Sequence, residues 1–167
     1  ELGSLGLTAH FSFDEKGSNA TVNAVDPSSS GLIHGPVSRE EGVFGRALKF
    51  DGATWVDAGQ VGVFDSDDQF SIAAYFRPTV QSGGAILSKM DDGNAYRGYD
   101  LNHVNGKVEC HAINHWPDKA FKLVTKQSVS LNKWHHVVVT YDGTRQASGV
   151  QLFLDGKLQE MDVTTNN

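Results

Sequence analysis

The chain has little of what would point to a metalloprotein, a membrane protein or a nucleic-acid binder. Cys110 is its only cysteine, which rules out a disulfide within the chain and any zinc or haem cysteine pattern. No apolar run approaches the length of a membrane span. The 14 Lys and Arg are scattered and outnumbered by 20 Asp and Glu, whereas a nucleic-acid binder usually has a basic face. We therefore expect no nucleic-acid partner and no membrane span.

Proline is also scarce, with 4 residues against 18 glycines, as in chains with many short strands joined by turns. Residues 134–143 and 150–157 are rich in β-branched and aromatic side chains, and both contain Asp-Gly, which suits a tight turn. No long stretch has a helical period, because alternation of apolar and polar residues dominates. The pattern predicts an all-β fold, a two-sheet antiparallel β-sandwich of jelly-roll type, with residues 1–167 as a single domain.

One hairpin can be read in register from the sequence. Asn105-Gly106 is a strong two-residue turn signal, and a turn there places Val104 opposite Lys107. Strand side chains alternate between the two faces of a sheet, so every other pair follows. The predicted core face carries Tyr99, Leu101, His103, Val108, Cys110 and Ala112. The predicted wet face carries Asp100, Asn102, Glu109 and His111.

Other segments give further expectations. Alternation predicts strands over residues 5–13 and 70–76, and Asp51-Gly52 predicts a turn. His135 and His136 are neighbours on a predicted strand, so they point to opposite faces and cannot bind one metal together. We expect one of them to face the core with a hydrogen bond and the other to face solvent.

Four segments resemble those of a known family. Residues 7–15 carry Phe-x-Phe-Asp, and residues 42–52 carry Gly-x-x-Gly-x-Ala-Leu-x-Phe-Asp-Gly. The third segment is residues 70–78, and the fourth is residues 134–143 with residues 152–156. Their order and spacing are similar to a laminin-G-like domain of the concanavalin A-like lectin/glucanase superfamily. The resemblance implies two packed antiparallel sheets, binding of sugars or proteins, and in some members a structural calcium ion or glucanase activity.

A narrower resemblance covers residues 115–125, 134–136, 147–150 and 155–157. These are similar to the version found within large planctomycete envelope proteins with cytochrome-c-like segments, which implies an extracellular, periplasmic or cell-envelope location. Family members normally continue after the turn at Asp155-Gly156 to a last strand with Gly-x-Ile-Asp-Glu-Val. Since this sequence has none, we expect a fragment that lacks its closing C-terminal strands and is completed by the remainder of its parent chain or by another protein segment.

The glucanase motif of the superfamily, Glu-x-Asp-x-Glu, is absent, so we expect no enzyme. The nearest pattern is Asp100-x-Asn102 facing Glu109-x-His111, and it makes a glycoside hydrolase a remote alternative. Paired polar residues on a wet sheet face explain the same pattern.

The main expectation is a non-catalytic binding module, with carbohydrate as its ligand. Sugars are recognised by aromatic faces and by planar polar groups, and both lie along the predicted hairpin or at its ends. The candidate ligand-binding residues are Tyr96, Arg97, Asp100, Asn102, Glu109, His111, His115 and Trp116. The alternative is a structural or protein-interaction domain in which Trp116 covers the sandwich edge and Tyr96 caps the core.

For cofactors, the sequence leaves open none or a structural calcium ion. Calcium prefers carboxylate and carbonyl oxygens. Asp26, Asp57 and Asp142 lie in or near predicted turns, and Asp91-Asp92-Gly93-Asn94 is the densest oxygen cluster. Turn formation alone explains all of these residues.

Overall fold

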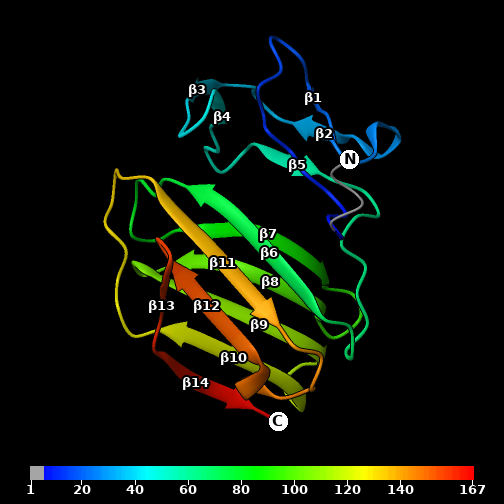
Figure 1. The fold of residues 1–167 in the computed structure, drawn as a ribbon, viewed down its shortest axis with the longest axis vertical. Helices are drawn as coiled ribbons and strands as arrows, with labels where there is room; N and C mark the ends of the chain where they lie inside the picture. Colours follow the sequence, from blue (N-terminus) through cyan, green and yellow to red (C-terminus); the bar gives the residue numbers. More distant parts are fainter. Residues whose placement is uncertain (1–5) are drawn as a thin grey trace. The chain divides into compact units, whose positions relative to one another are not determined.

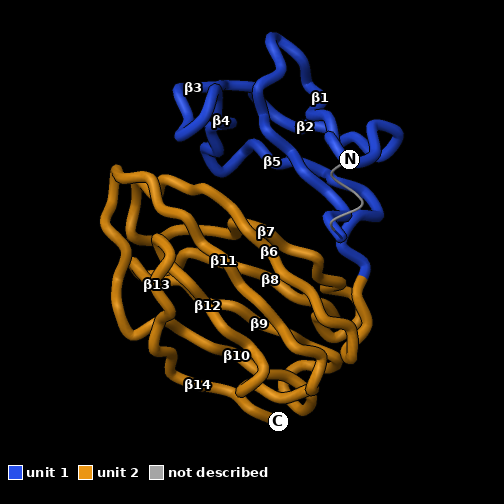
Figure 2. Tube along the Cα trace, viewed as in Figure 1, with its two compact units in different colours: residues 1–63 blue, residues 64–167 orange. Residues whose placement is uncertain are grey.

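The computed structural model describes residues 6–167. The chain divides into two compact units, residues 1–63 and residues 64–167 (Figure 2). The elements are β-strands and short 3₁₀ turns, with no α-helix in the described part of the chain. The all-β prediction is therefore confirmed, while the prediction of one domain from 1 to 167 stays a prediction.

The second unit consists of two antiparallel sheets (Figure 1). The five-stranded sheet has the order β14-β10-β9-β8-β7, and the four-stranded sheet has the order β13-β12-β11-β6. The first is built from β7 (Gly84–Asp91), β8 (Arg97–Val104), β9 (Lys107–His115), β10 (Lys119–Thr125) and β14 (Met161–Asn166). The second is built from β6 (Phe70–Phe76), β11 (His135–Tyr141), β12 (Val150–Leu154) and β13 (Lys157–Leu158).

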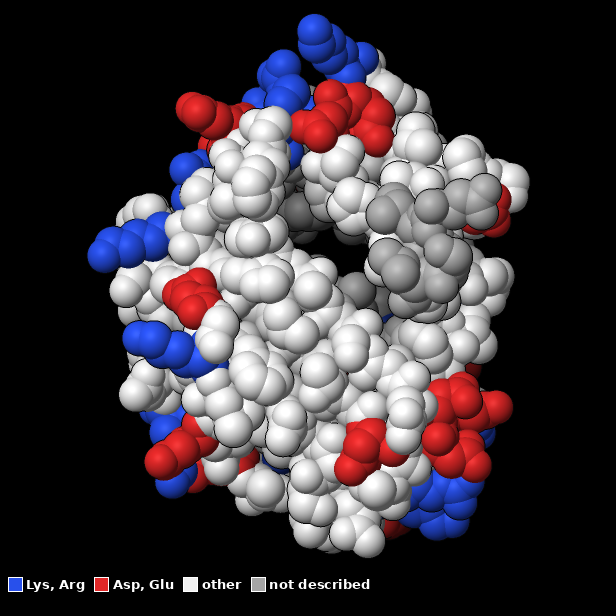
Figure 3. Space-filling view, viewed as in Figure 1, with Lys and Arg blue, Asp and Glu red and all other residues white. Residues whose placement is uncertain are grey.

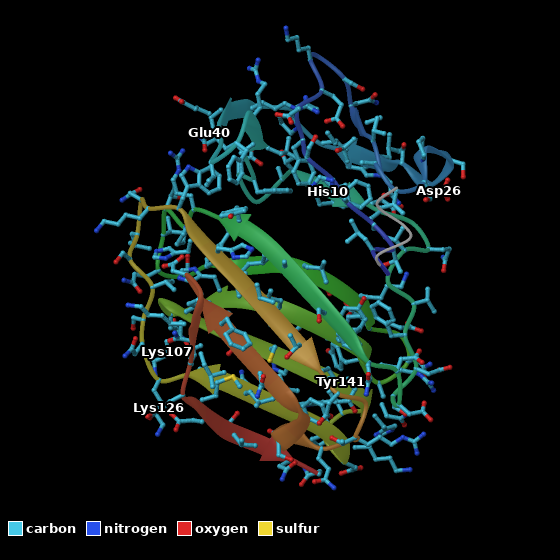
Figure 4. All side chains as sticks on the ribbon, in the orientation of Figure 1. His10, Asp26, Glu40, Lys107, Lys126 and Tyr141 are labelled. Carbon is cyan, nitrogen blue, oxygen red and sulfur yellow. The ribbon has the colours of Figure 1, made fainter. Side chains whose placement is uncertain are left out.

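The core of this unit lies between the two sheets, because alternate residues of each strand point inward. Leu101, Val108, Cys110 and Leu123 come from the five-stranded sheet, and Val137, Val139, Leu152 and Leu154 come from the four-stranded sheet. Tyr141, at the end of β11 (Figure 4), is also buried, and its hydroxyl donates to the carbonyl oxygen of Ser66 at 2.8 Å. The result is a β-sandwich consistent with the concanavalin A-like fold, as the sequence predicts.

The turn residues fix the hairpin registers as expected. Asn105 and Gly106 both have positive φ, 51° and 76°, which a two-residue turn of this kind needs. Val104 accordingly pairs with Lys107, and the remaining pairs run to Tyr99 with Ala112 and Gly98 with Ile113. Leu101 and Cys110 point into the core, so the predicted register of this hairpin is confirmed.

The first unit is smaller. A three-stranded sheet has the order β1-β2-β5, formed by β1 (Ala20–Thr21), β2 (Gly31–His34) and β5 (Trp55–Asp57). A separate two-stranded ribbon pairs β3 (Arg39–Glu41) with β4 (Arg46–Leu48). The turn at Asp51-Gly52 is confirmed, since the Asp51 carboxylate accepts hydrogen bonds from the backbone N–H groups of Ala53 and Thr54. The strands on its two sides belong to different sheets.

The predicted strand over residues 5–13 is wrong for the described part of that segment, and Leu5 lies outside the described residues. Between residues 6 and 13 the only ladder contact is an isolated bridge from Phe11 to Asn23. Phe13 has φ 63°, which interrupts an extended strand, and Leu7 is 40% exposed. Alternation of apolar and polar residues does not ensure that another strand lies alongside to pair with this segment, and a strand without a partner is not stable.

Candidate functional site

The polar face of the β8–β9 hairpin brings Asp100 and His111 together. They are directly opposite in the register, and the Asp100 Oδ1 atom lies 2.7 Å from His111 Nδ1 and 3.1 Å from the His111 backbone nitrogen. An ionised carboxylate can only accept, so His111 Nδ1 donates to it. In the neutral ring this leaves Nε2 as a hydrogen-bond acceptor at a fixed orientation.

Glu109 and Asn102 form the next pair along the same face. The Glu109 carboxylate lies 2.9 Å from the ammonium group of Lys122 on β10. The side chains of Asp100, Glu109 and His111 are only 13–14% exposed. The charged part of the expected wet face is therefore shielded, because Asp100 lies against His111 and Glu109 lies against Lys122 on neighbouring strands.

The ends of these strands form a more open rim. Trp116 follows β9, and its backbone nitrogen donates to the carbonyl oxygen of Ala95, in the β7–β8 loop, at 3.0 Å. That bond holds the end of the β7–β8 loop, with Tyr96 next to the first residue of β8, Arg97, beside the end of β9, where Trp116 follows His115. Tyr96 is 50% exposed and Trp116 is 36% exposed. Two exposed aromatic residues thus belong to segments that a backbone hydrogen bond ties together.

The backbone of the β7–β8 loop is conformationally unusual. Ala95 and Tyr96 both have positive φ, 51° and 59°, a region that residues other than glycine, asparagine and aspartate seldom adopt. The Arg97 nitrogen donates to the Asn94 carbonyl oxygen at 3.0 Å, which closes the turn. Strained loops of this kind are concentrated at binding and catalytic sites. The exposure of Tyr96 does not fit a residue that caps the core.

Trp116 also connects the rim to the paired charges. Its ring lies edge-on to the His111 ring, with the centroids 6.1 Å apart. His115 is further out, with its side chain 59% exposed and its Nδ1 atom 3.9 Å from an Asp118 oxygen. The eight predicted site residues therefore fall into two groups: the shielded Asp100, Asn102, Glu109 and His111, and the rim residues Tyr96, Arg97, His115 and Trp116.

Two groups on the buried side of the same hairpin, Cys110 and Tyr99, have raised pKa values. Burial raises the pKa of the Cys110 thiol to about 12, with a further contribution from the charges of Asp100 and Glu109. Burial likewise raises the pKa of Tyr99. Both groups are therefore neutral at physiological pH and act as packing residues.

Among the calcium candidates, Asp57 and Asp91 are the last residues of β5 and β7, and Asp26 and Asp142 bond to residues of their own turns. The Asp26 carboxylate accepts from the Ser28 nitrogen and hydroxyl and from the Ser29 hydroxyl, and Asp142 accepts from Thr144 in the same way. These hydrogen bonds lower the pKa of both carboxyl groups. Within residues 6–167, no three His, Cys, Asp or Glu residues are close enough to hold a metal ion together. Structural calcium stays a prediction.

The two adjacent histidines behave as the sequence predicts. His135 faces inward and is bonded at both ring nitrogens, to Asp155 at 2.9 Å and to the Ser130 carbonyl oxygen at 3.0 Å. His136 faces outward and stacks on Tyr75, with ring centroids 4.4 Å apart. The sequence reasoning did not identify this stacked pair as a candidate contact surface, although the strand alternation through 70–76 and 134–141 places both residues on the outer face.

Comparison with known proteins places the chain in a family. The model of the laminin-G-like family described as the concanavalin A-like lectin/glucanases superfamily matches residues 50–167, so the chain belongs to this family. No curated protein matches it significantly in sequence. No helix in the described residues is long and apolar enough to cross a membrane.

Two solved structures share the fold. The binding domain of Paraclostridial Mosquitocidal Protein 1 is similar over 96% of this chain with a TM-score of 0.69 and 13% identity. An S-layer domain-containing protein (residues 221–444) from Clostridium thermocellum ATCC 27405 is similar over 92% of this chain with a TM-score of 0.59 and 19% identity. This chain spans 42% of the first structure and 71% of the second.

Proposed function

We propose that this protein is a non-catalytic carbohydrate-binding module and that the rim of the β8–β9 hairpin is its ligand site. One observation carries the proposal: Tyr96 and Trp116 are both exposed on loops joined by the Trp116–Ala95 backbone hydrogen bond. Exposed aromatic rings stack on the apolar faces of sugar rings. His111 Nε2 and the Arg97 side chain supply an acceptor and donors for hydroxyl groups.

The shielded residues have a supporting role in this proposal. Asp100 orients the His111 ring, and Lys122 pairs with Glu109. A glycosidase needs two carboxyl groups free to act on either side of the scissile bond. Here Asp100 and Glu109 already accept from His111 and Lys122, which favours binding over catalysis.

The wider setting is part of the proposal. The resemblance to domains of planctomycete envelope proteins and the fold shared with an S-layer domain-containing protein support an exported protein located outside the cell or in the envelope. In that setting the module attaches a larger parent protein to a polysaccharide. A structural or protein-interaction domain is the alternative class.

The test is a glycan array followed by affinity measurements with Trp116→Ala. Loss of one stacking ring weakens sugar binding by about five- to ten-fold, on the usual strength of aromatic contacts. Trp55→Ala is the matched control, because Trp55 is an exposed tryptophan (56%) in the first unit, outside the rim. If the wild-type protein binds no plant, algal or bacterial glycan on the array, the structural alternative is favoured. Hydrolysis that is lost in Glu109→Gln would favour an enzyme.

A further inference from the structure

The outward face of the four-stranded sheet has a composition that differs from the rest of the second unit. Its members are the side chains that point away from the core on β6, β11, β12 and β13. We call it the neutral face: Ser71, Ala73, Tyr75, His136, Val138, Thr140, Gln151, Phe153 and Leu158. None of these is an Asp, Glu, Lys or Arg.

The strand register arranges the neutral face in three rows. Ala73, Val138, Phe153 and Leu158 are successive cross-strand partners, so one apolar row crosses all four strands. Ser71, Thr140 and Gln151 form a row of uncharged hydrogen-bonding groups on one side of it. The stacked Tyr75 and His136 rings form the row on the other side.

This face is open to solvent. Tyr75 is 48% exposed and Leu158 is 59% exposed. In the apolar row, Ala73 and Leu158 at the two ends are exposed, and Val138 and Phe153 between them are partly exposed. Apolar surface left in contact with solvent can mark a site of interaction. The charged side chains visible on the same side of the second unit gather around its margin, and the area over β6, β11 and β12 is free of them (Figures 1 and 3).

We propose that the neutral face binds an uncharged polysaccharide laid across the four strands. A neutral sugar chain presents C–H faces that match the apolar row and hydroxyl groups that match Ser71, Thr140, Gln151 and the Tyr75–His136 pair. An anionic polysaccharide is disfavoured, because the nine side chains of the face include no Lys or Arg and the protein carries a net charge of −6. The nearest cation in sequence on β6 is Arg77, just beyond the strand end, and its guanidinium group lies over the Trp134 ring, 5.3 Å from the centroid. This second contact surface goes beyond the rim site and does not depend on it.

The size of the face favours a polysaccharide over a second copy of this chain. Three inter-strand spacings of about 4.8 Å and four residues of rise give a patch roughly 14 Å on each side. Such a patch has an area on the order of 200–400 Å², whereas a stable protein interface needs about 800 Å² from each partner. A ligand only a few sugar rings long covers it.

The experiment is native affinity electrophoresis of the whole chain in gels with hydroxyethyl cellulose, xyloglucan or galactomannan, and with alginate as the anionic probe. We expect retardation by a neutral polymer and none by alginate. Tyr75→Ala should weaken binding at least about five-fold, and Tyr75→Phe, which keeps the ring, should retain it. Ala73→Glu places a charge at the β6 end of the apolar row without removing packing, and it should abolish retardation. Val163→Ala is the control, since Val163 is an exposed residue (51%) on β14 of the other sheet.

The outcomes separate the two sites. Neutral-polymer binding that is lost in Ala73→Glu but kept in Trp116→Ala supports the neutral face, whatever happens to the rim. Binding lost only in Trp116→Ala overturns the neutral face and supports the rim. The proposal is also overturned if no neutral polymer retards the wild-type protein. A dimer detected by light scattering that Ala73→Glu dissociates would overturn it as well, because a second copy would then occupy the face.

Discussion

A buried histidine makes the stability of the second unit depend on pH. His103 is 3% exposed, and its Nε2 atom has no hydrogen-bond partner among the described residues. Its ring lies 6.2 Å from that of Phe76, which also contacts His135. Burial lowers the pKa of His103 from its ordinary value of 6.5, and His135 adds to this effect. The folded protein therefore keeps His103 neutral at a pH where the unfolded chain protonates it.

The size of the effect follows from proton linkage. Below pH 6.5, His103 binds a proton in the unfolded state but not in the folded state, so the free energy of unfolding falls as the pH falls. At pH 5.5 an unfolded histidine with that pKa stabilises the unfolded state by about 1.4 kcal/mol, and at pH 7.5 by less than about 0.1 kcal/mol. The difference of about 1.3 kcal/mol is an upper limit, reached when the folded pKa lies well below 5.5.

Urea denaturation at pH 7.5 and pH 5.5 measures this, with His103→Leu as the comparison. The leucine variant fills similar space and cannot titrate, so it should lose up to about 1.3 kcal/mol less than the wild-type protein on acidification. Groups that do not interact with His103 titrate alike in both proteins and cancel in this difference; His135, which does interact with it, is the exception. An equal loss of stability in the two proteins would refute the reasoning, since His103 would then take up its proton without unfolding.

Two further predictions concern groups near the sites. Asp155→Ala should lower the free energy of unfolding by about 2–3 kcal/mol in thermal or urea unfolding, because it removes the acceptors for the His136 backbone nitrogen and for His135 and puts alanine at φ 50°, which alanine disfavours. Asp155→Asn should destabilise the protein less, because asparagine tolerates that φ. Equal losses in the two variants would contradict this account. Hydrogen bonds lower the pKa of Asp155, chiefly that from the His136 nitrogen, so this stabilisation is present above its ordinary pKa of 3.8 and is lost as the pH falls through the lowered value. Cys110 should resist alkylation by iodoacetamide at pH 8 in the native protein and react fully in urea, because it is buried and its pKa is raised. Mass spectrometry measures the extent of alkylation. Rapid alkylation of the native protein would contradict this prediction.

The sequence was most informative where turn chemistry fixes geometry. Asn105-Gly106 and Asp155-Gly156 adopt the positive φ values that two-residue turns require, and the registers of β8–β9 and β12–β13 follow from them. Alternation alone was less reliable. It identified β6 correctly, but it also predicted a strand before Phe13, where the structure has one isolated bridge. Alternation reports which side chains could share a face, and it carries no information about which strand lies alongside.

The candidate sites show a second limit of sequence reasoning. The polar alternation of Asp100, Asn102, Glu109 and His111 predicted a wet face, and the structure has a layer of pairs that is mostly shielded. Cross-strand pairing with Lys122 could not be read from the hairpin, since β10 lies outside it. The sequence did not predict the neutral face, because its apolar residues look like core residues rather than surface residues. Val138 and Phe153 belong to strands so rich in apolar residues that their outward members look like core in the sequence.

These two misreadings bear on where a ligand can bind. Polar groups that are already bonded must give up those bonds to contact a sugar, and breaking a charged hydrogen bond costs about 1.5–3 kcal/mol. Asp100 and Glu109 are in that position, whereas Trp116 and Tyr96 contribute exposed aromatic rings, whose stacking on a sugar does not use a carboxylate. Asp100→Asn should therefore act on ligand binding only through the His111 ring, with a smaller effect than Trp116→Ala. A larger effect would mean that the carboxylate itself contacts the sugar.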